Sequence, residues 1–219
     1  SLLTTVNNSD VIGKLLAIAS LFPVGMLVGC FTLILFRRDL HTISFLVGNG
    51  LCEGINLILK NIVKESRPMV RAYQYTDYGM PSSHSQMAWF FAAYTILFVL
   101  FRLHHNRDSV FEMLWKVSTL LSVVVMAALV MYSRVYLLYH SWAQVLVGAV
   151  LGVVLGVSWF AVVHLLLSPF FPIVVSMSVF ELLMIRDTSL IPNILWFEYT
   201  NARTENRTRS RKLVPMKSQ

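Results

Sequence analysis

The amino-acid sequence predicts an all-α protein, a polytopic bundle of transmembrane helices, and three observations lead to this fold class. Hydrophobic residues make up 56% of the 219 residues and charged residues only 13%, a balance that would leave large apolar patches on a water-soluble domain. Several apolar runs approach or exceed the roughly 20 residues that cross a bilayer as a helix. No polar linker divides the chain, so we expect one transmembrane domain at residues 1–200.

The expected membrane spans follow five apolar runs, at residues 14–36, 42–63, 87–104, 113–134 and 142–167. The first run is too long for the core of a signal peptide, and its flanking basic residues, Arg37 and Arg38, follow it, so we expect a retained span. A sixth apolar run extends from Phe171 to Ile185 and contains Pro172 and Glu181. Its length of about fifteen residues favours a short interfacial or re-entrant helix, with a sixth crossing as the alternative.

Five spans divide the connecting segments between the two faces of a membrane. One face receives the N-terminus, residues 64–86 and residues 135–141, and the other receives residues 37–41, residues 105–112 and the tail. The second face carries Arg37, Arg38 and Arg107, so the positive-inside tendency places it in the cytosol and the first face in a lumen or the exterior. We expect the basic tail at residues 201–219 to be solvated and disordered.

The formal net charge of +7 does not point to nucleic acid, because the basic residues gather at the ends of apolar runs and in the tail. Cys30 and Cys52 each lie inside an expected span without the close paired spacing of a zinc site or redox motif. We expect both to be small buried side chains. The expected partners are therefore the bilayer and a membrane lipid.

Three polar clusters stand at expected helix ends on the non-cytosolic face. They are residues 60–68, which read Lys-Asn-Ile-Val-Lys-Glu-Ser-Arg-Pro, residues 81–84, which read Pro-Ser-Ser-His, and residues 133–140, which begin with Ser-Arg and end with His. The clusters are far apart in sequence, yet the topology brings these helix ends to one side of the membrane. We therefore expect them to form one site.

Such a group of residues suits phosphoryl transfer, in which most of the catalytic benefit comes from fixed positive charge around an anionic, loosely bonded transition state. Lys60, Arg67 and Arg134 supply that charge, and a planar guanidinium can hold two phosphate oxygens at once. The backbone amides of Ser82 and Ser83, at the start of the third span, add aligned donors at a helix N-terminus. We expect these five residues to bind phosphate.

Two histidines, His84 and His140, then divide the chemical work. One attacks phosphorus to form a phosphohistidine, and the other protonates the leaving oxygen and later activates water. The clusters contain one carboxylate, Glu65, and no cage of oxygen ligands for a divalent cation. We expect neither metal nor cofactor, because lysine and arginine provide the charge that magnesium provides in other phosphoryl-transfer enzymes.

The spacing of these residues resembles the three-part signature of the type 2 phosphatidic acid phosphatase superfamily. Lys60 is followed after six residues by Arg67-Pro68, the second part reads Pro81-Ser82-Ser83-His84, and Ser133-Arg134 is followed after five residues by His140. The resemblance implies that the three basic residues bind phosphate with help from the two serines. It also implies that His84 is the general acid and base and that His140 is the nucleophile.

Longer stretches narrow the resemblance to the eukaryotic dolichyl pyrophosphate phosphatases within that superfamily. They are residues 40–46, 78–86 and 185–193, and the likeness extends over nearly the whole chain. It implies hydrolysis of dolichyl pyrophosphate to dolichyl phosphate at the lumenal face of the endoplasmic reticulum, which recycles the lipid carrier for protein N-glycosylation. Two alternatives stay open: a phosphatase for another lipid phosphate or pyrophosphate, and a catalytically inactive lipid transporter or scaffold.

Two positions depart from the superfamily pattern. Ser83 replaces the usual glycine, and Gln144 stands four residues after His140, where the superfamily usually has aspartate. An aspartate would orient the imidazole and stabilise its cation, whereas Gln144 can fix the tautomer but cannot neutralise charge. Glu53 lies about two helical turns before Lys60, and three roles stay open for it: a neutral side chain, the partner of a lysine or arginine, or the source of the missing charge. A pyrophosphate offers a better leaving group than a monophosphate ester, which favours a pyrophosphate substrate.

Three further polar residues carry structural expectations. Asn56, inside the second span, is expected to form a hydrogen bond between helices. Arg186 and Asp187 follow the sixth apolar run, and one option is that they pair with each other at the cytosolic surface. No chemistry follows from that pair.

Overall fold

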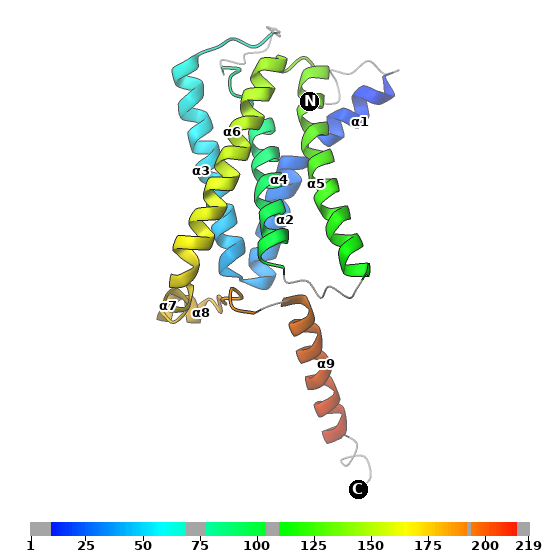
Figure 1. Cartoon of the computed structure of the whole chain (residues 1–219), viewed down its shortest axis with the longest axis vertical. Coiled ribbons are helices and arrows are strands. Elements are labelled where there is room, and N and C mark those ends of the chain that lie inside the picture. The colour runs from blue at the N-terminus through cyan, green and yellow to red at the C-terminus, as the bar shows by residue number, and fades with distance from the viewer. Residues whose placement is uncertain (1–9, 69–77, 104–109, 192–193, 214–219) are drawn as a thin grey trace.

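The computed structural model describes residues 10–68, 78–103, 110–191 and 194–213, and its regular elements there are helices (Figure 1). These are α1 (Val11–Ala19), α2 (Phe22–Arg37), α3 (Leu40–Val63), α4 (Ser83–Phe101), α5 (Val110–Tyr136), α6 (Trp142–Ala161), α7 (Phe171–Val175), α8 (Ser178–Leu182) and α9 (Ile194–Leu213). A π-helical segment (Val162–Leu167) and a 3₁₀ turn (Ser168–Phe170) join α6 to α7. Five helical stretches are long and apolar enough to cross a membrane, which confirms the predicted transmembrane bundle.

The third and fourth predicted spans correspond to α4 and α5, and both helices start earlier than the apolar runs do. α4 begins at Ser83, four residues before the predicted span, and α5 begins at Val110, three residues before it. The early start places His84 in the first turn of α4. Arg107, one of the basic residues that suggested the orientation, lies outside the described residues.

The first predicted span consists of two helices. α1 ends before Ser20, and α2 has Pro23 in its first turn, where proline is tolerated because its missing N–H group would have no helical acceptor. The Ser20 hydroxyl donates a 2.7 Å hydrogen bond to the Ala17 carbonyl oxygen at the break. α1 therefore leans away from α2 and packs against α5 (Figure 1).

α4 lies at the centre of the bundle and packs closely on α6 through glycines. A Cβ atom added at Gly152 would lie 2.2 Å from the Gln86 carbonyl oxygen, and one at Gly156 would lie 2.8 Å from the Phe90 carbonyl oxygen. Together with Gly148, these residues form a repeat of three glycines spaced four residues apart in α6. Such a repeat lets two membrane helices approach backbone to backbone, so it is a sequence signal for this contact.

Replacing Gly152 with valine is expected to lower thermal stability, because the added side chain must displace the backbone of α4. Overpacking of this kind costs about 1–3 kcal/mol, which lowers the unfolding midpoint of a chain of this size by roughly 3–10 °C. The measurement is the unfolding midpoint of the purified protein in detergent. Gly29→Val is the matched control, since nothing lies within 4 Å of a Cβ atom there. Equal midpoints for the two variants would contradict the close α4–α6 contact.

Two buried amides connect α3 to α4 inside the bundle. Asn56 Nδ2 donates to Gln86 Oε1 at 2.6 Å, and Gln86 Nε2 donates to the Cys52 carbonyl oxygen at 2.9 Å. The predicted interhelical role of Asn56 is therefore confirmed, and both cysteines are buried as expected. The buried residues of the apolar core beside this network are Met26, Cys30, Phe45, Cys52, Phe90, Tyr94 and Phe160.

The apolar run from Phe171 to Ile185 forms two five-residue helices, α7 and α8, and not a span. Each is far shorter than the roughly 20 residues that a crossing needs. α7 continues the long stretch that starts with α6. Phe171 packs with Leu40 and Val163 in a small apolar cluster, which holds this end of the chain against α3.

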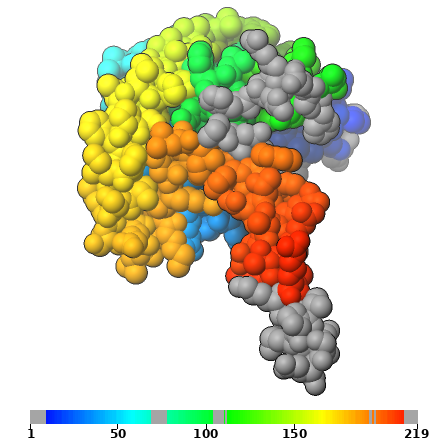
Figure 2. Space-filling model, turned by 60° about the horizontal axis from the view of Figure 1, so that its bottom comes forward, coloured from blue at the N-terminus to red at the C-terminus, as the bar shows by residue number. Residues whose placement is uncertain are grey.

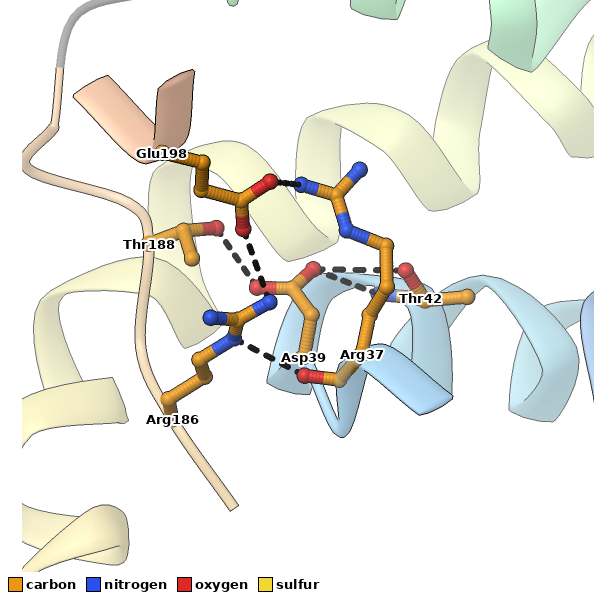
Figure 3. Close-up of polar contacts among 6 residues, drawn as sticks. All are labelled: Arg37, Asp39, Thr42, Arg186, Thr188 and Glu198. Carbon is orange, nitrogen blue, oxygen red and sulfur yellow. Dashed lines mark hydrogen bonds and ion pairs between the residues drawn. The ribbon is translucent and has the colours of Figure 1, made fainter. Parts of the chain in front are cut away.

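The segment after α8 is attached to the turn between α2 and α3 (Figure 3). Arg186 forms a parallel bridge with Asp39: the Arg186 amide donates to the Arg38 carbonyl oxygen at 2.9 Å, and the Arg186 carbonyl oxygen accepts from the Leu40 amide at 3.1 Å. The Thr188 hydroxyl adds a 2.5 Å hydrogen bond to the Asp39 carboxylate. This end of the bundle is therefore closed by backbone contacts between distant segments.

Glu198 of α9 joins the same cluster (Figure 3). Its carboxylate accepts from Arg37 at 2.9 Å and from Arg186 at 2.8 Å. Arg186 thus pairs with Glu198 and not with its neighbour Asp187, whose carboxylate accepts from the Ser189 amide at 2.8 Å. The pairing of Arg186 with Asp187 that the sequence suggested is corrected, because the chain turns Arg186 toward the α2–α3 turn.

α9 stands out from the bundle at the end opposite to α1 (Figures 1 and 2). It extends from Ile194 to Leu213, so it crosses the expected domain boundary at residue 200, and residues 201–213 are helical where we expected disorder. Strong helix formers and one-turn ion pairs explain the difference, and Arg209 contacts Glu205 at 2.7 Å. The rest of the expected tail, residues 214–219, lies outside the described residues.

Candidate active site

The three polar clusters meet at one end of the bundle, the upper end in Figure 1. The ends of α3 and α5 and the starts of α4 and α6 lie there, on the side of α1 and away from α9. Lys60, Arg67, Arg134 and His140 all lie close enough to His84 to influence it electrostatically. Residues from three distant parts of the chain therefore form one site, as the topology predicted.

Three basic side chains surround this site at low solvent exposure. Lys60, in the last turn of α3, is 5% exposed, and Arg134, in the last turn of α5, is 6% exposed. Arg67 follows the end of α3 and is half-buried. Charges held away from bulk water are weakly screened, so this arrangement suits a multiply charged anion such as a phosphate or pyrophosphate group.

The turn between α5 and α6 explains the fixed spacing of Arg134 and His140. The Arg134 carbonyl oxygen accepts hydrogen bonds from the amides of Tyr139, at 3.0 Å, and His140, at 3.2 Å. Leu138 reverses the chain with a left-handed φ of 57°. The Arg134 guanidinium lies 4.3 Å from the centroid of the Tyr139 ring, a cation–π contact that fixes its position next to the turn.

His140 is buried, and two acceptors hold one edge of its ring. Nδ1 lies 2.9 Å from the Gly79 carbonyl oxygen and 3.1 Å from Gln144 Oε1. Because both partners only accept, Nδ1 carries the proton and Nε2 keeps its lone pair. Burial, followed by the positive charges of Arg134 and Arg67, lowers the pKa of His140 to about 4. The ring is therefore neutral near pH 7, as a nucleophile must be.

The side chain of Gln144 connects His140 to a carboxylate of the first cluster. Gln144 Nε2 donates to Glu65 Oε1 at 2.8 Å and to the Ser66 carbonyl oxygen at 2.9 Å. The carboxylate in contact with Gln144 is therefore Glu65, whereas Glu53, the candidate named from the sequence, lies half-buried within α3. The sequence signal for Glu65 was its place as the single carboxylate of residues 60–68.

Ser82 and Ser83 lie at the N-terminus of α4, but they offer different groups to a phosphate. The Ser82 amide, which we expected to bind phosphate, donates to the Gln144 carbonyl oxygen at 3.2 Å. Within the described part of the chain, the buried Ser82 hydroxyl has no hydrogen-bond partner, so this hydroxyl fits a phosphate oxygen. Ser83 is the first residue of α4 and is half-buried. Its amide belongs to the open N-terminal turn, which attracts anions.

Two glycines outside the three motifs keep the site compact. A Cβ atom at Gly79 would lie 2.8 Å from the amide of the Gln144 side chain, and one at Gly148 would lie 2.6 Å from the Ser82 carbonyl oxygen. Larger residues would therefore push Gln144 away from His140 or α6 away from the start of α4. Motif spacing misses both glycines, although Gly148 belongs to the glycine repeat of α6.

Among the described residues, no group of three or more His, Cys, Asp or Glu side chains could hold a metal ion. The positive charge at the site comes from lysine and arginine side chains. Metal independence stays a prediction, and a chelator experiment tests it directly.

A family model described as the PAP2 superfamily matches residues 41–168, which include the three polar clusters. The chain belongs to the PAP2 superfamily. Dolichyldiphosphatase 1 of Homo sapiens is 50% identical over 93% of this chain and 87% of that protein. Dolichyldiphosphatase 1 of Dictyostelium discoideum is 38% identical over 94% of this chain and 90% of that protein. Lipid phosphate phosphatase gamma of Arabidopsis thaliana is 39% identical over 89% of this chain and 85% of that protein.

A solved structure shares the fold of this PAP2 member. The crystal structure of a transmembrane PAP2 type phosphatidylglycerolphosphate phosphatase from Bacillus subtilis matches with a TM-score of 0.56 and 20% identity, over 72% of this chain and 80% of that one. At that identity the likeness establishes the fold alone. The PAP2 match and the dolichyldiphosphatase relatives confirm the predicted family and make the chain a phosphatase.

Proposed function

We propose that this protein hydrolyses dolichyl pyrophosphate to dolichyl phosphate and inorganic phosphate through a phosphohistidine formed on His140. The observation that carries the proposal is the state of His140, a buried neutral imidazole whose Nδ1–H is held by Gly79 and Gln144 and whose Nε2 has no hydrogen-bond partner among the described residues. The choice of lipid rests on the relatives, which are dolichyldiphosphatases over most of this chain.

In the first step, the terminal phosphate lies among basic and hydroxyl groups supplied by Lys60, Arg67, Arg134, Ser82 and Ser83. His140 Nε2 attacks the terminal phosphorus, and the new P–N bond forms as the bond from phosphorus to the bridging oxygen breaks. The bridging oxygen takes the electron pair and a proton from His84, and dolichyl phosphate leaves. The fixed cations stabilise the charge on the transferring group throughout.

In the second step, neutral His84 accepts a proton from water while the water oxygen attacks the phosphohistidine. The P–N bond breaks, inorganic phosphate leaves, and His140 Nε2 regains its lone pair. A pyrophosphate suits this site because its leaving group is a phosphate, which departs more easily than an alkoxide. A nucleophile whose neighbour is the neutral Gln144 therefore suffices.

We place the protein in the endoplasmic reticulum membrane with the site facing the lumen. Two features support this orientation: the site and α1 lie at one end of the bundle, and α9 lies at the other (Figure 1). α9 carries Arg203, Arg207, Arg209 and Arg211, so the positive-inside tendency puts that end in the cytosol. In this location the released dolichyl phosphate returns to the carrier pool for protein N-glycosylation.

Purified protein in detergent with excess EDTA is expected to release inorganic phosphate from dolichyl pyrophosphate as fast as without chelator. Dolichyl phosphate should accumulate in equal amount. We expect kcat/KM for dolichyl pyrophosphate to exceed kcat/KM for phosphatidic acid and for sphingoid phosphate by roughly tenfold or more. A tenfold ratio is about 1.4 kcal/mol of transition-state stabilisation. Undecaprenyl pyrophosphate in the same panel tests whether the enzyme distinguishes between polyprenyl chains.

The panel also separates the rival functions. Loss of activity with EDTA would overturn metal independence. Equal or faster turnover of the monophosphate lipids would identify a phosphatase for another lipid. No phosphate release from any lipid, by protein with an intact unfolding transition, would favour the inactive transporter or scaffold.

A further inference from the structure

The amide of Gln144 can adopt only one of its two orientations. Oε1 faces His140 Nδ1 at 3.1 Å and the Ser141 amide at 3.3 Å, and Nε2 faces Glu65 Oε1 at 2.8 Å and the Ser66 carbonyl oxygen at 2.9 Å. Turning the amide over would set its NH₂ group against the Ser141 N–H group and its oxygen against two acceptors. The contacts on the Glu65 side thus decide which Gln144 atom meets His140.

Glu65 also supports the second acceptor of His140. The Gly79 carbonyl oxygen, 2.9 Å from His140 Nδ1, belongs to a residue whose amide donates to the Glu65 carbonyl oxygen at 2.7 Å. The side chain of Glu65 therefore holds Gln144, and its backbone holds Gly79. Both groups that keep the proton on His140 Nδ1 depend on this one residue.

Attack on phosphorus makes the His140 ring cationic, and the neutral Gln144 cannot offset that charge. The Glu65 carboxylate, half-buried behind the amide, is a negative group connected to the ring through two hydrogen bonds. A carboxylate that polarises an amide strengthens the carbonyl end of that amide as an acceptor. His140, Gln144 and Glu65 thus form a hydrogen-bonded series. It resembles a catalytic triad, except that the Gln144 amide lies between the imidazole and the carboxylate.

We infer that Glu65 is a positioning residue that acts on His140 through Gln144 and supplies the negative charge that Gln144 lacks. This inference rests on the proposed function, because it gives Glu65 a role in the same reaction. Glu65 touches neither the phosphate group nor the attacking nitrogen in this scheme. Its effect lies in the tautomer of His140 and in the stability of the cation that forms there.

An exchange of charge between two isosteric side chains tests the inference. Glu65→Gln keeps a side chain that accepts from Gln144 and removes the charge. The kcat for dolichyl pyrophosphate should therefore fall about 10- to 100-fold, as expected when a group that orients the neighbour of a reacting side chain is lost. KM should stay unchanged. Gln144→Glu should also lower kcat, because two carboxylates then face each other at hydrogen-bond distance. The double variant returns one carboxylate and one amide to the pair, and kcat should recover above either single variant.

A second readout does not depend on the substrate. Diethyl pyrocarbonate modifies the free nitrogen of a neutral imidazole, and mass spectrometry can follow His140 with His84 as the internal reference. Glu65→Gln should slow modification of His140 relative to His84, and the double variant should restore it. Glu181→Gln, the same chemical change on exposed α8 at the other end of the bundle, should change neither readout.

The outcomes distinguish the two claims. Wild-type protein that hydrolyses no lipid pyrophosphate would overturn the proposed function, whatever the modification rates are. Active wild-type protein with a Glu65→Gln variant of equal kcat, or a double variant no faster than the slower single variant, would overturn the role of Glu65. A rise in KM with unchanged kcat would likewise overturn it, because it would place Glu65 in substrate binding.

Discussion

His140→Ala is expected to abolish turnover of dolichyl pyrophosphate, with kcat falling by about 10⁴-fold or more, as for other covalent nucleophiles. The physical reason is that no other described group presents a buried neutral nitrogen with its opposite edge held by two acceptors. Lipid binding should persist, since Lys60, Arg67 and Arg134 remain. The measurements are phosphate release in detergent and binding of the labelled lipid.

Chemical trapping strengthens this test. Wild-type protein mixed with lipid labelled in the terminal phosphate and quenched in alkali should carry label on His140, because a P–N bond survives alkali. His140→Ala should carry none. His164→Ala, in the π-helical segment that follows α6, is the control histidine and should keep both turnover and label. A measurable rate in His140→Ala above background would refute the assignment of the nucleophile.

His84→Ala has the second largest expected effect, a fall of about 10²- to 10⁴-fold in steady-state rate, the usual range for a general acid and base. The two steps should suffer unequally. The first step expels a phosphate and needs little help from an acid, whereas the second must activate water. We therefore expect the phosphohistidine to accumulate in His84→Ala to a higher level than in the wild type.

A rapid-quench experiment measures this imbalance. His84→Ala should release one equivalent of dolichyl phosphate in a first turnover and then free phosphate slowly, with label retained on His140. A slow first turnover without trapped label would instead show that proton donation to the leaving group is the main task of His84. Equal rates for the variant and the wild type would remove His84 from the mechanism.

The sequence predicted well the helices that are long and apolar. It predicted less well a break within a helical stretch and a helix that is exposed to solvent. The run at residues 14–36 was predicted as one span, and Val11–Arg37 is one candidate span in the structure. Hydropathy does not register the break at Ser20 inside this span, where α2 begins with Pro23 as its second residue. Residues 201–219 were expected to be disordered because their composition is polar, yet residues 201–213 continue α9, and Glu198 holds the start of this helix against Arg37 and Arg186. The contact between Arg37 and Glu198 joins segments about 160 residues apart, and the composition of the tail cannot predict such a contact.

The sequence by itself determined the class of site. Lys60, His84, Arg134 and His140 stand at the ends of apolar segments, and the length of those segments leaves one face of the membrane on which they can meet. The type of each residue then limits the chemistry, since cations and two histidines without a carboxylate cage suit phosphate transfer. Spacing within each motif follows from local geometry. For example, the amides of Tyr139 and His140 both donate to the Arg134 carbonyl oxygen, which accounts for the spacing between Arg134 and His140.

The tertiary structure alone decided which groups support His140. Glu53 and Glu65 were both carboxylates near Lys60, and only the fold brings Glu65 to Gln144. In the same way, the Ser82 amide proved to be engaged by the Gln144 carbonyl oxygen. These contacts depend on the direction of side chains and on backbone atoms from segments distant in sequence. Residue order specifies neither. A hydrogen bond tolerates errors of only about a few tenths of an ångström in its length, and such positions are set only when α3, α4 and α6 are packed together.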